Sequence, residues 1–348
     1  IDFSWGDGCA SIGAFPRFAP AAMARSRFLP DNFTLALLTT VALASVLPAA
    51  GGVARFFEGL TVAAVGLLFF LHGAKLSRQA IVAGLSHWRL HLVVVASTFV
   101  LFPLLGWALR PVLQPLVTPD LYLGVLFLCA LPATVQSAIA FTAMARGNMP
   151  AAICSASAST LLGIVITPLL TGLLLSRTAA AQHDALDSIG RIMLQLFVPF
   201  IAGHLLRPWI GGLTQRHAPV LKFVDQGAIL LVVYTAFSAA VVEGLWHQMP
   251  LPALAGLLVV CAVILALALC FTTWLSRRLG FSKEDEVTIV FCGSKKSLAS
   301  GVPMAKVLFA AHAVGAMVLP LMVFHQMQLM VCAVLAQRYA RRLPSAQD

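Results

Sequence analysis

Two adjacent lysines, Lys295 and Lys296, lie in the middle of an apolar segment long enough to cross a membrane. They follow Asp285 by about ten residues, which at ~1.5 Å per residue puts them about 15 Å deep. This is near the centre of a hydrocarbon layer ~30 Å thick, where a lysine is costly unless it meets water, a carbonyl or an anion. We therefore expect the pair to hold backbone carbonyls, bind an anionic substrate or lose a proton during transport. The alternative is a cytoplasmic turn over 293–297, but the apolar stretch before it, 287–292, is too short to be a span.

Polar side chains accompany the lysines in the same segment and in a second one. Besides the two lysines, the candidates for binding a substrate or an ion are Ser294, Ser297, Thr134, Gln136 and Ser137. The last three could instead hydrogen-bond across helices, as polar side chains in membranes often do. Interhelical hydrogen bonding is also the role expected for the scattered residues His72, Gln195, His204, His325, Gln326 and Gln328.

The two segments that carry the candidate site also contain helix breakers. These are Pro132 in the first segment and Gly293, Gly301 and Pro303 in the second. Proline removes a backbone donor and clashes with the preceding turn, so we expect both segments to break or bend near the middle of the membrane. The freed amides and carbonyls would face each other, and the half-helix ends would offer sites for an anion and for a cation.

The elements that position these segments are membrane helices. Of the 348 residues, 60% are hydrophobic and 10% are charged, whereas roughly 25% are charged in a soluble domain. No stretch alternates with a period of two, so we expect an all-α integral membrane protein and not a barrel. The predicted spans lie near 33–49, 58–76, 90–109, 121–145, 151–175, 189–206, 226–243, 251–275, 285–310 and 313–336.

The net charge of +10 is explained by topology and not by nucleic acid. With the N-terminus in the cytoplasm, fifteen basic residues fall on the cytoplasmic side and five on the other, which follows the positive-inside rule. We therefore expect ten spans in the inner (plasma) membrane with both termini cytoplasmic.

The longest polar connection divides the chain into two halves of five spans each. Because five is odd, the second half is inverted, an arrangement that many secondary transporters use to alternate access. The expected divisions are an N-terminal extension without fixed structure (1–27), a first repeat (28–176), a connecting loop (177–190), a second repeat (191–340) and a cytoplasmic tail (341–348). We expect the natural start at Met23 and no cleaved signal peptide.

The sequence Phe-Cys-Gly-Ser-Lys-Lys-Ser-Leu-Ala over 291–299, followed by Gly-Val-Pro over 301–303, resembles the signature of the SBF-like branch of the bile acid:sodium symporter family. Leu-Pro-Ala-Thr over 131–134, Arg-Gly-Asn over 146–148 and Ser-Thr-Leu-Leu-Gly over 159–163 support it. The resemblance covers about residues 28 to 340. It implies ten helices in two inverted five-helix repeats, a panel and a core domain, and broken helices four and nine that cross.

The chain departs from the sodium-coupled branch at the ion site. There, the resemblance implies a glutamate and a Gln-Asn pair, but aligned through Gly293 this chain has Phe291, Lys295 and Lys296. All thirteen acidic residues lie in termini, loops or span ends, and hard cations prefer oxygen ligands. We therefore expect a secondary active transporter that moves a small organic anion by alternating access, with a sodium ion or a proton as the candidate coupling ion and the proton favoured over sodium.

Two other functions stay open at this stage: a non-transporting membrane regulator of ion homeostasis, such as that of calcium, and a cation/proton antiporter. An enzyme is not expected, because the chain lacks the His-Glu-x-x-His motif of a protease and the membrane carboxylates that would hold a metal. We expect no metal centre and no cofactor other than the coupling ion. The expected partners are the organic anion, the bilayer and at most a second copy of the chain in a homodimer.

Overall fold

The computed structural model describes residues 32–75, 87–176, 185–242, 244, 250–309 and 314–341. The predictions that fall on residues 1–31, including the N-terminal extension, lie outside the described residues, as does most of the predicted tail. Every regular element in the described ranges is helical, which confirms the predicted all-α class.

Up to residue 176, the helices in chain order are α1 (Asn32–Val46), α2 (Gly51–Lys75), α4 (Trp88–Ala96), the π-helix η2 (Ser97–Leu101), α5 (Phe102–Ala108), α6 (Arg110–Leu113), the 3-10 helix η3 (Gln114–Leu116), α7 (Pro119–Ala130), α8 (Gln136–Met144) and α9 (Met149–Ser176). The later helices are α10 (Ala185–Arg216), α11 (Ala218–Val242), α13 (Leu251–Arg278), α14 (Lys283–Gly293), α15 (Leu298–Leu308) and α16 (Val314–Ala340). Seven of the described helical stretches are long and apolar enough to cross a membrane: α2, α4 to α5, α9, α10, α11, α13 and α16. Helices α1 and α7 are shorter and also apolar.

Helix α10 begins within the predicted connecting loop of 177–190. It starts at Ala185, because the helix continues through polar sequence beyond the apolar stretch that hydropathy marks. Apolar length therefore locates the membrane segment but not the end of the helix.

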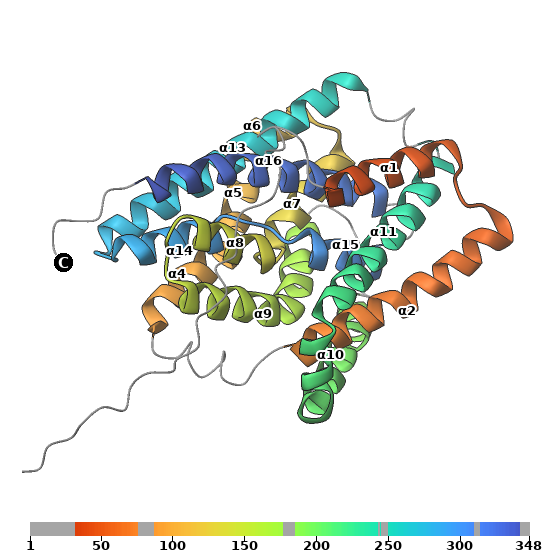
Figure 1. Cartoon of the computed structure of the whole chain (residues 1–348). Coiled ribbons are helices and arrows are strands. Elements are labelled where there is room, and N and C mark those ends of the chain that lie inside the picture. The colour runs from red at the N-terminus through yellow and green to blue at the C-terminus, as the bar shows by residue number, and fades with distance from the viewer. Residues whose placement is uncertain are drawn as a thin grey trace, which may run out of the picture.

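The helices form two groups that lie beside each other (Figure 1). Helices α1, α2, α10 and α11 pack together on one side, while α4 to α9, α13, α14 and α16 form the other group. Helix α15 contacts both α16 in the second group and α11 in the first. Large apolar side chains such as Trp209 and Leu251 are exposed on the outside, as expected where helices face lipid.

Two glycines allow α2 and α10 to pack closely. A Cβ atom at Gly203 would lie 1.9 Å from the carbonyl oxygen of Phe70, and one at Gly73 would lie 2.0 Å from that of Phe200. Only glycine fits at such distances, and small residues are a common means by which membrane helices approach each other. The first group is therefore held by backbone contact and not only by side-chain packing.

Candidate functional site

Two helices are interrupted in the middle. Helix α7 ends at Ala130 and α8 begins at Gln136, with residues 131–135 non-helical between them. Helix α14 ends at Gly293 and α15 begins at Leu298, with residues 294–297 non-helical. The two non-helical segments meet.

The meeting is a direct backbone contact. The N–H of Ser297 donates to the carbonyl oxygen of Pro132 at 3.0 Å. Gly301 and Pro303 lie inside α15 and not at its break. A Cβ atom at Gly301 would come within 2.5 Å of Leu131 Cδ1, so this glycine provides room for the other segment.

Lys296 binds the end of the other interrupted helix. Its Nζ donates to the carbonyl oxygens of Thr98, Cys129 and Leu131, at 2.8, 2.9 and 2.7 Å, and lies 4.2 Å from the ring centroid of Phe102. The side chain is completely buried. Three donated bonds need three N–H groups, which a lysine has only as the charged ammonium. The arrangement is thus a cation enclosed by carbonyl oxygens and an aromatic face.

The Thr98 carbonyl is available because of the π-helix. The N–H of Phe102, which would bond to Thr98 in a regular helix, donates instead to Ser97. The next residue is Pro103, which has no N–H. This leaves the Thr98 carbonyl without a regular intrahelical donor, and the Lys296 ammonium takes that place. Single π-helical turns inside helices are often found at functional sites.

The other two carbonyls belong to the C-terminal end of α7. The N–H of Ala133, which would reach Cys129 if the helix continued, donates to the Ser159 hydroxyl at 2.9 Å. The Leu131 carbonyl lies in the break itself. A helix C-terminus carries partial negative charge, so a cation at this place is favourable. Lys296 therefore caps α7.

Lys295 has a different environment. Its Nζ donates to the carbonyl oxygen of Ser137, on α8, at 3.0 Å. It lies 3.8 Å from the ring centroid of Phe141 and 5.1 Å from that of Phe291. A single hydrogen bond can be made by either the charged or the neutral amine, so this contact leaves Lys295 able to lose a proton.

The predicted hydroxyl ligands are used mainly in local bonds. Thr134 Oγ1 pairs with Ser137 Oγ, while Ser294 Oγ donates to Val290 O at 2.6 Å. Ser297 Oγ accepts from the N–H of Ser300 and caps α15. Gln136, at the start of α8, is exposed. The structure therefore brings the lysines together with backbone carbonyls, and not with a cluster of side-chain oxygens.

Gln328, on α16, belongs to the site, although the sequence predicts only an interhelical hydrogen-bond partner at this position. Its Oε1 accepts from the backbone N–H of Lys296, and its Nε2 donates to the carbonyl oxygen of the same residue, both at 2.9 Å. The expected interhelical role is confirmed here. Its importance could not be inferred, because nothing in the sequence shows that Lys296 leaves the helical conformation.

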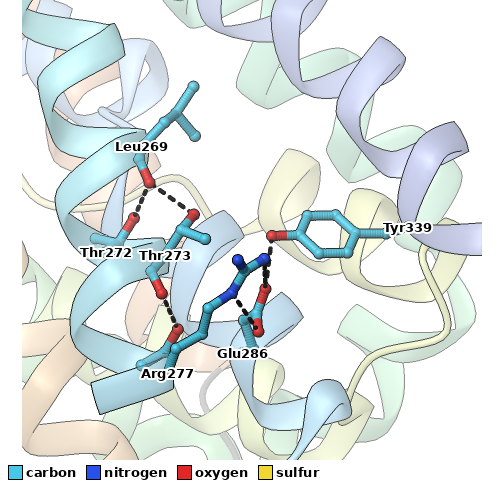
Figure 2. Close-up of polar contacts among 7 residues, drawn as sticks. Leu269, Thr272, Thr273, Arg277, Glu286 and Tyr339 are labelled. Carbon is cyan, nitrogen blue, oxygen red and sulfur yellow. Dashed lines mark hydrogen bonds and ion pairs between the residues drawn. The ribbon is translucent and has the colours of Figure 1, made fainter. Parts of the chain in front are cut away.

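Carboxylates are absent from this crossing in the described part of the chain. The one buried carboxylate in the described ranges is Glu286, in the first turn of α14. It accepts from Arg277 Nε and Nη2 at 3.1 and 3.0 Å and from the Tyr339 hydroxyl at 3.1 Å (Figure 2). Glu286 thereby links α13, α14 and α16, at the end of α14 that lies opposite the lysines.

Metal binding finds no support in the described residues. His87 and His91 are one helical turn apart, a spacing that some metal sites use. However, His91 Nδ1 lies 2.7 Å from Ser155 Oγ, and His87 is exposed. The described ranges hold no group of three His, Cys, Asp or Glu side chains placed to bind a metal ion.

A bundle of membrane-length helices with two interrupted helices in contact at their breaks is the architecture of a membrane transporter. The chain belongs to the SBF-like CPA transporter family, whose model matches residues 31–341. This confirms the resemblance and makes the chain a member of a family of transporters.

Several relatives cover nearly the whole chain. The "Uncharacterized protein PA2026" of Pseudomonas aeruginosa is 71% identical over 93% of this chain and 97% of its own length. The "Putative symporter YfeH" of Escherichia coli is 58% identical over 91% of this chain and 95% of its own. The "Sodium/bile acid cotransporter 7" of Xenopus tropicalis is 30% identical over 89% and 91%.

Proposed function

We propose that this chain is a secondary active transporter that moves a small organic anion across the inner membrane by alternating access. Its site is the contact between the breaks of α7/α8 and α14/α15. Ten spans in two inverted five-helix repeats would follow if each interrupted pair forms one span. Both termini would then be cytoplasmic, with one chain as the transport unit, either as a monomer or within a homodimer.

The observation that carries the proposal is the enclosure of the Lys296 ammonium by three carbonyl oxygens. Transporters with broken helices place coupling cations at half-helix C-termini and unwound carbonyls. Here the protein's own ammonium occupies such a place, at the C-terminal end of α7. A sodium ion could not bind to the same carbonyl oxygens beside the ammonium, because two positive charges in contact repel each other strongly in a low-dielectric interior. Sodium is therefore not required at this position.

The two lysines would have separate roles. Lys296 is held as a cation by three acceptors, while Lys295 makes one hydrogen bond and two aromatic contacts. Lys295 is therefore the candidate for releasing a proton during the transport cycle. The N-terminal ends of α8 and α15, which carry partial positive charge, are the places where an anionic substrate would be favoured.

The two alternative functions are less well supported by the site. A cation antiporter would bind its ion through carboxylates, and the buried carboxylate in the described ranges, Glu286, is paired with Arg277. The names of two relatives describe a symporter and a cotransporter. A regulator without transport activity would be indicated if no solute moves.

Uptake into proteoliposomes tests the proposal. The purified protein would be reconstituted and offered radiolabelled taurocholate and a panel of small carboxylates, with sodium or choline as the cation. We expect uptake of at least one anion that does not depend on sodium. It should be lost in the Lys295→Ala, Lys296→Ala double variant and kept in Lys222→Ala, which removes an exposed lysine of α11. Uptake that survives in the double variant would refute the assigned site.

A further inference from the structure

The amide of Gln328 has a fixed orientation. Its two bonds to Lys296 pair a side-chain oxygen with a backbone N–H and a side-chain nitrogen with a backbone carbonyl. Backbone groups cannot exchange donor and acceptor roles. If the amide were turned over, Nε2 would face the Lys296 N–H, donor against donor, and Oε1 would face the Lys296 carbonyl, acceptor against acceptor. Nε2 must therefore be the atom that faces the Lys296 carbonyl.

This orientation determines the state of His325. The same Gln328 Nε2 lies 2.8 Å from His325 Nδ1. An amide nitrogen only donates, so Nδ1 must accept. The imidazole is therefore neutral and carries its proton on Nε2, because a protonated ring has a hydrogen on both nitrogens and no acceptor.

We propose that His325 is a proton-sensitive positioning residue for the crossing. In its neutral form it holds Gln328 in the orientation that binds both backbone groups of Lys296. Protonation would place a second donor against the Gln328 amide nitrogen, so that the ring or the amide must turn away. Loss of the amide from Lys296 would leave a buried backbone N–H and carbonyl without partners and loosen the ammonium from the α7 carbonyls. Acidification would thus act on the crossing through α16.

Other ionisable groups lie on α16 and on the helices packed against it. They are Asp120, Tyr122 and Cys129 on α7, Cys261, Cys270, Arg277 and Arg278 on α13, Lys306 on α15, Lys222, Asp225 and Tyr234 on α11, and Cys332, Arg338 and Tyr339 on α16 itself. Lys295 and Lys296 lie in the crossing. Many have partners elsewhere: Tyr122 with Gly106, Arg277 with Glu286, Lys306 with Glu58 and Asp225 with Lys75. Lys296 is held as an ammonium, so a proton on His325 would add a second positive charge to the network that Gln328 joins.

The first test is the protonation state itself. The wild-type protein, labelled with ¹⁵N at histidine and embedded in lipid nanodiscs, would be studied by NMR at neutral pH. The signals of His325 are identified as those missing from His325→Asn or, if that variant does not fold, from His325→Gln. We expect an unprotonated Nδ1 and a protonated Nε2. A charged ring, or a proton on Nδ1, would overturn the inference.

The second test is the pH dependence of the melting temperature, from pH ~8 to ~5, the range that spans histidine titration. Asparagine can place its side-chain oxygen near the position of Nδ1 but does not titrate. We expect the wild-type melting temperature to fall on acidification. His325→Asn should match it at the alkaline end and lose most of the fall, whereas His325→Leu should melt lower at the alkaline end. The control His217→Asn, at the junction of α10 and α11, should keep the wild-type profile, and an unchanged fall in His325→Asn would refute the role of His325.

The inference rests on the proposed function only for its use in transport, and the two can fail separately. If no solute enters proteoliposomes but His325 has an accepting Nδ1 and controls the melting profile, the transport proposal fails and the positioning role stands. If transport is observed but the His325 ring is charged or carries its proton on Nδ1, or the fall in melting temperature persists in His325→Asn, only the positioning role fails.

Discussion

The ammonium of Lys296 lies 2.7 Å from the carbonyl oxygen of Leu131, so the break of one interrupted helix is bound by a charge carried in the break of the other. This bond joins residues that are 165 positions apart. The Ser297–Pro132 backbone bond lies beside it. The crossing is therefore held by groups of the protein in a place where related architectures use an ion.

We predict that Lys296→Ala destabilises the protein strongly. The substitution leaves the carbonyls of Thr98, Cys129 and Leu131 buried without their donor, and a buried acceptor left without a partner costs about 1–3 kcal/mol. The melting temperature in nanodiscs would measure the loss. Lys222→Ala, on the exposed surface of α11, should change it little, and equal melting of the two variants would contradict the role of Lys296.

Pro103→Ala should interact with the Lys296 substitution. The new N–H at position 103 could bond to the Thr98 carbonyl and compete with the ammonium. We therefore expect Pro103→Ala to be neutral or destabilising in the wild type but stabilising, by about 1 kcal/mol, in the Lys296→Ala protein. A double-mutant cycle on melting free energies measures this coupling. Strict additivity would mean that the missing N–H of Pro103 is not what leaves the Thr98 carbonyl free for Lys296.

Lys295→Arg tests the separation of roles between the lysines. Arginine stays protonated at all accessible pH values, so a transporter that must release a proton at this position should lose pH-dependent uptake while remaining folded. The measurement is anion uptake at two external pH values, with the melting temperature as the folding control. Retention of the wild-type pH dependence would exclude Lys295 as the proton carrier.

Gly203→Ala should separate α2 from α10. The added methyl group would meet the Phe70 carbonyl oxygen at 1.9 Å, which a helix backbone cannot relieve locally, and such overpacking costs about 1–3 kcal/mol. Gly66→Ala is the matched control, because a Cβ atom there has nothing within 4 Å and alanine favours helix. Thermal melting of both variants decides whether the close contact is required.

Much of the architecture could be predicted from the sequence, because its causes are local. Apolar length marks membrane helices, and Pro132 together with Gly293 indicated where α7 and α14 end. Lys295 and Lys296 predict a functional site because charged side chains are rare at this depth in a membrane. By contrast, Gly301 and Pro303 lie within α15, where the next residues continue the helix despite them.

The contacts of the site depend on pairings between distant segments, which local patterns do not encode. The π-helix at Ser97–Leu101 and the bonds of Gln328 to Lys296 arise only when α4, α7 and α16 surround the break in the α14/α15 pair. The sequence showed the proline at position 103 but gave no reason to connect it with a lysine far along the chain. The separate environments of Lys295 and Lys296 were equally hidden, since the two residues are adjacent in sequence.

The most direct test of the central claim is the effect of sodium on the melting temperature of the purified wild-type protein, compared with choline at equal ionic strength. An ion that binds the folded state and not the unfolded state stabilises the folded state by an amount that grows with the ratio of its concentration to its dissociation constant. If the Lys296 ammonium occupies the cation place at the crossing, sodium and choline should give the same melting temperature. A sodium-specific increase that disappears in Lys296→Ala would contradict the account, because it would show that sodium binds at the crossing together with the lysine.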